Sequence, residues 1–162
     1  GSFQRDTEGH DLKSPKLEKG PDLLADALEL KNTSHRTAWG DSRDIHVVLA
    51  GWRRQYIMSR LDSAKIPYTY IERPDHSVIN ELYRTIDLYV VAAREEGGPQ
   101  ALIECGLTTT PVVSTPVGIA EQVLIDSAIN SSVINAKPAV PLVTHMNLPN
   151  GFKGYRELID YV

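Results

Sequence analysis

Short apolar runs alternate with longer amphipathic segments along most of this chain. The runs are rich in Val, Ile and Tyr, which is typical of strands buried in a parallel sheet. They lie at residues 45–50, 68–71, 88–92 and 111–114, and residues 1–4 resemble the end of a further strand. Segments with apolar residues at helical spacing lie between and after these runs, at residues 22–30, 53–65, 77–86, 101–107 and 119–125. Strands and helices are therefore predicted to alternate.

This alternation predicts the fold class. A β-α-β-α order favours a parallel sheet with helices on both faces, so we expect an α/β protein with a Rossmann-like, doubly wound sheet. The length of 162 residues suits a single domain. In such sheets a ligand binds beyond the carboxyl ends of the strands. The turns after residues 88–92 and 111–114 are therefore the places to look for a site.

The remaining segments are less regular. Residues 5–19 are polar and contain Gly9 and Pro15, which predicts a long loop. Residues 132–135 are predicted to be a last strand. Residues 151–162 have apolar residues at helical spacing and are predicted to form a closing helix.

Composition narrows the possible function. The net charge of −4 argues against a nucleic-acid partner, and no apolar run is long enough for a membrane span. No secretory signal is found, and the single cysteine, Cys105, fits a reducing compartment, so we expect a cytoplasmic protein. Cys105 is interpreted as a packing residue. None of the five histidines has a metal-ligand spacing, and we expect neither a metal nor a cofactor.

Candidate chemistry is concentrated between residues 94 and 121. Gly97 and Gly98 lie between Glu96 and Glu104, where a helix is predicted to begin. A helix N-terminus offers unpaired N–H groups and a positive dipole end, which suit a diphosphate, and glycine lets that anion approach the backbone. Carboxylates beside such a site are better suited to neutral hydroxyls, as on a ribose or a sugar ring. Diphosphate and hydroxyls together indicate a nucleotide sugar.

These motifs resemble those of a known enzyme family. The segment from Glu96 to Glu104 resembles the Glu-x7-Glu motif of the group 1, or family 4, retaining glycosyltransferases. Residues 110–121 are similar to the Gly-x-Pro-Val-Val segment and the Gly-Gly-x-x-Glu turn of that family. Lys19-Gly20 and Leu82-Tyr83 also match family positions. The resemblance covers about residues 1–126.

The resemblance implies an architecture and an activity. Catalytic units of the family have the GT-B arrangement, two Rossmann-like domains facing across a cleft. The resemblance implies that residues 1–162 are the C-terminal, donor-binding domain, and we expect the N-terminal acceptor domain to be absent from this sequence. We therefore expect a hexosyl-type glycosyltransferase domain that is inactive alone and has a nucleoside-diphosphate sugar and the N-terminal domain as partners. Membrane association is expected only through that absent half.

The resemblance also implies site residues. Glu96 would contact the donor sugar, Lys19 would neutralise the leaving diphosphate, and Arg5 would assist it, with Lys16 as the alternative to Arg5 because the family spacing is not kept. Glu104 would hold the ribose hydroxyls. The backbone of the intervening run would contact the sugar and the diphosphate: Gly97, Gly98, Pro99, Gln100 and Ala101. No metal ligand is expected.

Other interpretations stay open on the sequence alone. Glu96 could cap a helix, because acids favour a first helical turn. Glu104 lies in an otherwise apolar helical segment and needs a partner, which could be a ligand hydroxyl or a neighbouring protein group. At the level of function, the alternatives are a module that binds a nucleotide or a sugar phosphate without turnover, and a GT-B nucleotide-sugar epimerase.

Overall fold

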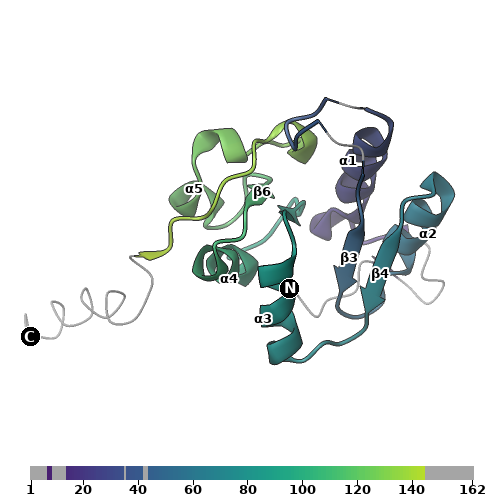
Figure 1. The fold of residues 1–162 in the computed structure, drawn as a ribbon, viewed down its shortest axis with the longest axis horizontal. Helices are drawn as coiled ribbons and strands as arrows, with labels where there is room; N and C mark the ends of the chain where they lie inside the picture. The colour runs from purple at the N-terminus through teal and green to yellow at the C-terminus, as the bar shows by residue number, and fades with distance from the viewer. Residues whose placement is uncertain (1–6, 9–13, 35, 42–43, 145–162) are drawn as a thin grey trace, which may run out of the picture.

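A computed structural model describes residues 7–8, 14–34, 36–41 and 44–144 of the chain (Figure 1). The main strands are β3 (Val47–Ala50), β4 (Tyr68–Ile71), β5 (Tyr89–Val91) and β6 (Val112–Ser114). The helices are α1 (Pro21–Thr33), α2 (Gln55–Ala64), α3 (His76–Thr85), α4 (Gln100–Thr108) and α5 (Ala120–Val123). Each of these elements lies within three residues of its predicted position.

All strand pairing between residues 45 and 114 is parallel. β3 pairs with β4, with Val47 opposite Tyr68, and β5 pairs with β6, with Tyr89 opposite Val112. The prediction of a parallel α/β fold is therefore confirmed. Within the described residues no ladder joins β3 to β5. In a doubly wound sheet the opening strand lies between the second and the fourth. The strand predicted at residues 1–4 lies outside the described residues.

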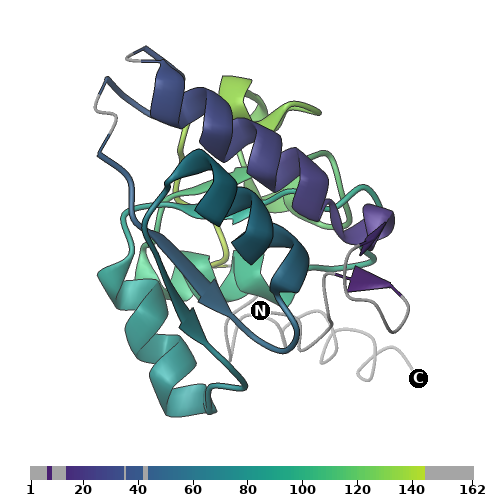
Figure 2. The same cartoon turned by 90° about the vertical axis from the view of Figure 1, so that its right-hand side faces the viewer.

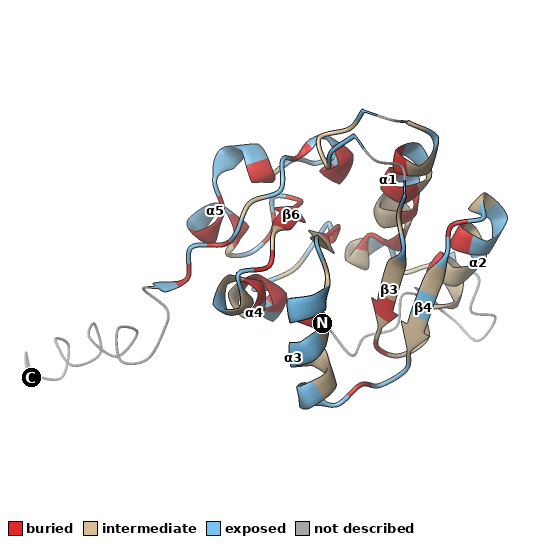
Figure 3. Ribbon diagram, viewed as in Figure 1, coloured by how far each residue is buried: buried red, intermediate tan, exposed pale blue. Residues whose placement is uncertain are grey.

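Apolar side chains pack in three clusters around these strands. Ala25 of α1, Leu49 of β3 and Leu61 of α2 belong to one cluster. Leu102 of α4 and Val112 of β6 belong to a second. Helix α1 also contributes Ala27 to a third cluster, with Val113 and Val133, and therefore contacts both strand pairs. Figure 2 shows α1 and α2 side by side, and Figure 3 shows buried and exposed positions on the same helices.

The segment before α1 differs from its prediction. The predicted loop at residues 5–19 contains a short antiparallel pair, β1 (Thr7–Glu8) with β2 (Ser14–Pro15), and a 3-10 turn, Leu17–Lys19. Polar composition alone predicted a loop because two-residue strands leave no periodic pattern. The 3-10 turn places Lys19 two residues before the start of α1.

Two further predictions are wrong in detail. Residues 132–135 are not a strand: Val133–Asn135 form a 3-10 turn whose Val133 and Ile134 are buried. Helix α5 has four residues, fewer than predicted. The predicted closing helix at residues 151–162 lies outside the described residues. In the described part of the chain, no helix has the length and apolar character that a membrane span requires.

Candidate functional site

Lys19 and Glu96 form an ion pair between two loops. Lys19 ends the 3-10 turn before α1, and Glu96 follows β5 by five residues. The Lys19 Nζ lies 2.7 Å from Glu96 Oε2, although the residues are 77 positions apart. Their side chains are 17% and 25% exposed, so both remain within reach of solvent and of a ligand. The structure thus brings together two of the three predicted catalytic residues, and the third, Arg5, lies outside the described residues.

Gly20 allows these two loops to approach each other. It has a φ of +62°, and a Cβ at this position would lie 1.8 Å from the backbone oxygen of Ala92. The backbone amides of Arg94 and Glu95 donate to the carbonyl of Glu18, at 2.9 and 3.2 Å. The turn that carries Lys19 is therefore fixed by backbone contacts to the segment that leads to Glu96.

A third loop completes the cluster at the carboxyl ends of β5 and β6. Gly118, in the turn after β6, has a φ of +51°, and a Cβ there would lie 2.8 Å from the backbone oxygen of Glu96. Thr115 donates its hydroxyl to the carbonyl of Ala93. Glu96 is therefore held between two neighbouring loops, at the sheet edge where ligands of doubly wound folds bind.

The glycine turn after Glu96 is open. Gly97 and Gly98 are exposed, and a Cβ at either position would meet no atom within 4 Å. Pro99 precedes α4 as its N-cap residue, without a side-chain hydrogen bond. Pro99 and Ala101 are buried, whereas Gln100 is exposed. Among the predicted donor-binding residues, Pro99 and Ala101 therefore contribute packing, and the surface next to the helix N-terminus consists of Gly97, Gly98 and Gln100.

Glu96 lies outside the helix. Because α4 begins at Gln100, only Glu104 of the two glutamates lies on that helix. The capping interpretation of Glu96 is wrong, since Pro99 is the N-cap residue of α4 and no side-chain hydrogen bond caps this helix. Pro99 after two glycines is the sequence signal for this later helix start, because proline favours the beginning of a helix.

Glu104 is anchored to the neighbouring helix. The hydroxyl of Tyr83, on α3, donates to Glu104 Oε2 at 2.6 Å. Burial is the main cause that raises the pKa of Tyr83, and the nearby Tyr89 and the bond to Glu104 add to it, so its hydroxyl stays protonated. This bond uses one of the roughly four acceptor positions of a carboxylate. Glu104 also lines a hollow of about 130 Å³ together with Tyr83 and five further residues: His76, Ile79, Asn80, Leu107 and Thr108.

Comparison with known proteins identifies the family. A family model described as Glycosyl transferases group 1 matches residues 12–142. The chain belongs to the group 1 glycosyltransferases.

A solved structure supports the fold of this group 1 glycosyltransferase. The crystal structure of a glycosyltransferase from Rickettsia africae ESF-5 superposes with a TM-score of 0.55 at 18% sequence identity. The match covers 82% of this chain and 34% of the other, so the chain spans about a third of that glycosyltransferase. At this identity the likeness shows the fold alone. No curated protein matches the sequence.

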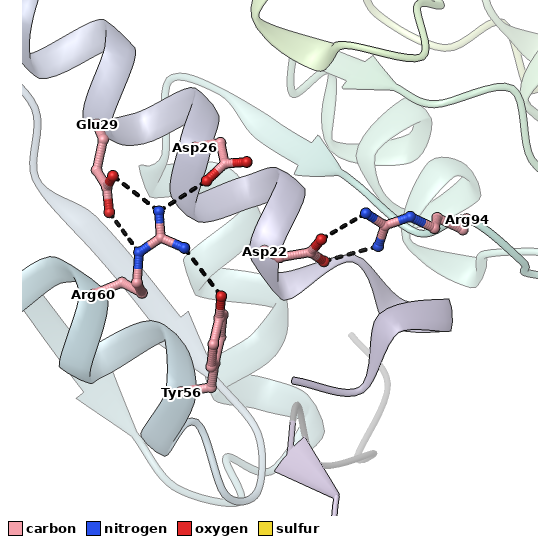
Figure 4. A network of polar contacts seen from close by, with 6 residues as sticks. All are labelled: Asp22, Asp26, Glu29, Tyr56, Arg60 and Arg94. Carbon is pink, nitrogen blue, oxygen red and sulfur yellow. Dashed lines mark hydrogen bonds and ion pairs between the residues drawn. The ribbon is translucent and has the colours of Figure 1, made fainter. Parts of the chain in front are cut away.

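Arg94 of the group 1 glycosyltransferase makes contacts that the sequence did not reveal. Its guanidinium contacts both carboxylate oxygens of Asp22, at 2.8 and 2.5 Å (Figure 4). It also donates to the carbonyl of Leu17 at 2.8 Å. The hydrogen bond from Arg94 is the main cause that lowers the pKa of Asp22. Lys16, the alternative second cation, contacts Glu18 at 3.2 Å. No local pattern marks Arg94, because its partner is 72 positions away.

Trp52 adds an aromatic group after β3. The guanidinium of Arg53 lies 4.2 Å from the Trp52 ring centroid, and that of Arg73, after β4, lies 4.9 Å from it. Such distances are typical of cation–π contacts. The ends of β3 and β4 in this glycosyltransferase therefore carry positive charge next to an aromatic ring.

Cys105 is a packing residue, as expected. It is fully buried on α4, and burial, followed by the charge of Glu104, raises the pKa of its thiol to about 12. The thiol is therefore protonated near neutral pH and unsuited to nucleophilic attack. Within the described residues, no three His, Cys, Asp or Glu side chains are grouped so that they could hold a metal ion.

Proposed function

We propose that this chain is the C-terminal, donor-binding domain of a retaining GT-B glycosyltransferase and binds a nucleoside-diphosphate sugar. The observation that carries the proposal is the Lys19–Glu96 pair beside the open turn of Gly97 and Gly98. This arrangement places an ammonium and a carboxylate next to an exposed glycine turn that leads to the N-terminus of α4. An N-terminal domain would supply the acceptor side of the cleft.

The positive groups suit the diphosphate. The N-terminus of α4 presents backbone N–H groups, and the exposed glycines beside it leave room for phosphate oxygens. Lys19 would meet the charge that builds up when the anomeric carbon–oxygen bond breaks and its electron pair moves to the phosphate. Fixed positive groups stabilise such charge strongly. With Lys19 and the helix in these roles, we propose that the reaction uses no metal.

The carboxylates suit hydroxyl groups. Glu96 would accept hydrogen bonds from the donor sugar once Lys19 turns to the diphosphate, and Glu104 would accept them from the ribose. An acceptor hydroxyl oxygen would then bond to the anomeric carbon with retained configuration. Its proton would pass to the departing nucleoside diphosphate. We assign no protein nucleophile.

A Glu104→Gln substitution is expected to weaken nucleotide binding by about tenfold or more, because a hydrogen bond to a charged group contributes about 1.5–3 kcal/mol. The measurement is calorimetric titration of this chain with UDP, GDP and ADP. Thermal melting of the same samples reports folding. Glu81→Gln, an exposed position on α3, is the matched control. Normal melting with unchanged affinity for every nucleotide would count against the assignment of Glu104.

Product analysis of the complete enzyme separates the classes of function. We expect the sugar to be transferred to an acceptor by the complete enzyme and not by this chain alone. An epimerised nucleotide sugar, or binding without turnover, would instead support one of the two alternative functions.

A further inference from the structure

Arg94 connects the two loops that carry the proposed catalytic residues. It lies two positions before Glu96, and its side chain contacts residues on either side of Lys19 in the sequence, the carbonyl of Leu17 and the carboxylate of Asp22. The backbone amide of Arg94 also donates to Glu18. One residue of the Glu96 loop therefore contacts the turn that carries Lys19 at two points and the first turn of α1 at a third.

We propose that Asp22 and Arg94 are positioning residues that hold Lys19 and Glu96 in register for the donor diphosphate. This inference rests on the proposed function. Neither residue needs to touch the donor, because both act through the loop geometry. A two-pronged contact between guanidinium and carboxylate fixes orientation as well as distance, which a single-point contact does not.

Stability alone is a poor explanation for the pair. The Arg94 side chain is 40% exposed and that of Asp22 is 21% exposed. Exposed ion pairs contribute little to the free energy of unfolding because water screens them. The contact matters more for where it lies, since small displacements of charged groups at a reacting centre lower rates strongly.

Helix α1, which carries Asp22, also forms a second ion pair that serves as a matched control. Arg60 of α2 contacts Glu29 of α1 through both carboxylate oxygens, at 2.7 and 2.9 Å, and Asp26 at 2.8 Å. This contact joins α1 to α2, and its acceptors do not include Asp22 (Figure 4). Arg60→Ala therefore removes a comparable ion pair from α1 without affecting the site.

The first test is hydrogen exchange in the full chain without ligand. The amide of Glu95 donates to Glu18, so it reports whether the two loops stay together. Arg94→Ala is expected to speed its exchange by about tenfold, because the loops open more often. Arg60→Ala is expected to leave it unchanged. Equal exchange in the wild type and Arg94→Ala would overturn the inference.

The second test is titration with UDP. Asp22→Asn is expected to weaken UDP binding by about fivefold, although it removes a negative charge that would otherwise repel the ligand. A direct phosphate contact by Arg94 predicts the opposite, because Asp22→Asn would release the guanidinium. Unchanged or tighter binding by Asp22→Asn would therefore refute the positioning role.

A double-mutant cycle shows whether the pair acts through Lys19. Adding Asp22→Asn to Lys19→Met is expected to cause no further loss of UDP affinity. A fully additive loss of affinity would contradict the inference. If Lys19→Met alone leaves UDP affinity unchanged, the proposed function fails, whereas the exchange test still decides whether Arg94 holds the loops together. The two failures are thus distinguishable.

Discussion

Lys19→Met is expected to lower the rate of sugar transfer by the complete enzyme about 100- to 1,000-fold, the usual effect of removing one group that stabilises charge in the transition state. Methionine keeps most of the side chain's length and removes its charge. The loss is expected mainly in kcat, because the leaving diphosphate gains charge only as the bond breaks. Steady-state kinetics with varied donor concentration measures it.

Two other lysines make this experiment specific. Lys137 is exposed, and Lys137→Met is expected to retain normal activity. Lys16→Met tests the alternative cation, which contacts Glu18 in the same loop. A rate within threefold of the wild type for Lys19→Met, with normal melting, would show that the diphosphate is neutralised elsewhere.

Gly20→Ala is expected to remove more than about 4 kcal/mol from the free energy of unfolding, a loss that few single substitutions reach. Two costs add up here. The φ of +62° strains any residue with a Cβ, and that Cβ would lie 1.8 Å from the Ala92 oxygen and 2.7 Å from its carbon. Both are backbone atoms, which cannot move aside as the end of a side chain can. Urea denaturation followed by circular dichroism measures the loss.

Gly40→Ala separates the two costs. Gly40 has a φ of +106°, and a Cβ there would meet nothing within 4 Å, so this variant has the backbone strain without the collision. It is expected to lose about 1–3 kcal/mol. If Gly20→Ala lost no more than Gly40→Ala, the close approach of the two loops would be absent in solution.

The sequence predicted the elements that have a clear period. The strand at residues 68–71 is found with the predicted bounds, and the helix predicted at residues 22–30 is α1, extended by three residues at its end. Both have apolar residues at a regular spacing, which local sequence records directly. β-branched residues alone do not decide the element. Residues 132–135 have the Val and Ile of a strand, but packing of Val133 against Val113 and Ala27 accompanies a 3-10 turn.

The start of α3 shows a second limit of prediction from sequence, because two neighbouring residues could cap the helix. The segment predicted to be helical begins at Ser77, but Asp75 caps α3, accepting a hydrogen bond from the Val78 amide at 2.9 Å. The hydroxyl of Ser77 donates to Asp75 instead. Both residue types are good caps, and only the three-dimensional contacts choose between them.

The residues of the candidate site also differ in whether the sequence reveals them. Lys19, Glu96 and Glu104 could be singled out from motifs, and the structure adds the ion pair and the contact from Tyr83. Arg94 and Asp22 could not be found, because an ion pair between residues 72 positions apart leaves no periodic or local signal. Contacts that position a site from outside its motifs emerge only from the fold.

The glycines of the site fall into two classes that selection experiments should separate. Gly20 and Gly118 face backbone atoms of the same chain, so substitution harms the protein itself. Gly97 and Gly98 face empty space, so the folded chain tolerates a Cβ there. In a library of variants, sorting for cellular abundance would preserve glycine at 20 and 118 only, and sorting for turnover would preserve it at all four. Positions where glycine is preserved only when variants are sorted for turnover would show where the donor lies against the backbone, without any ligand being observed.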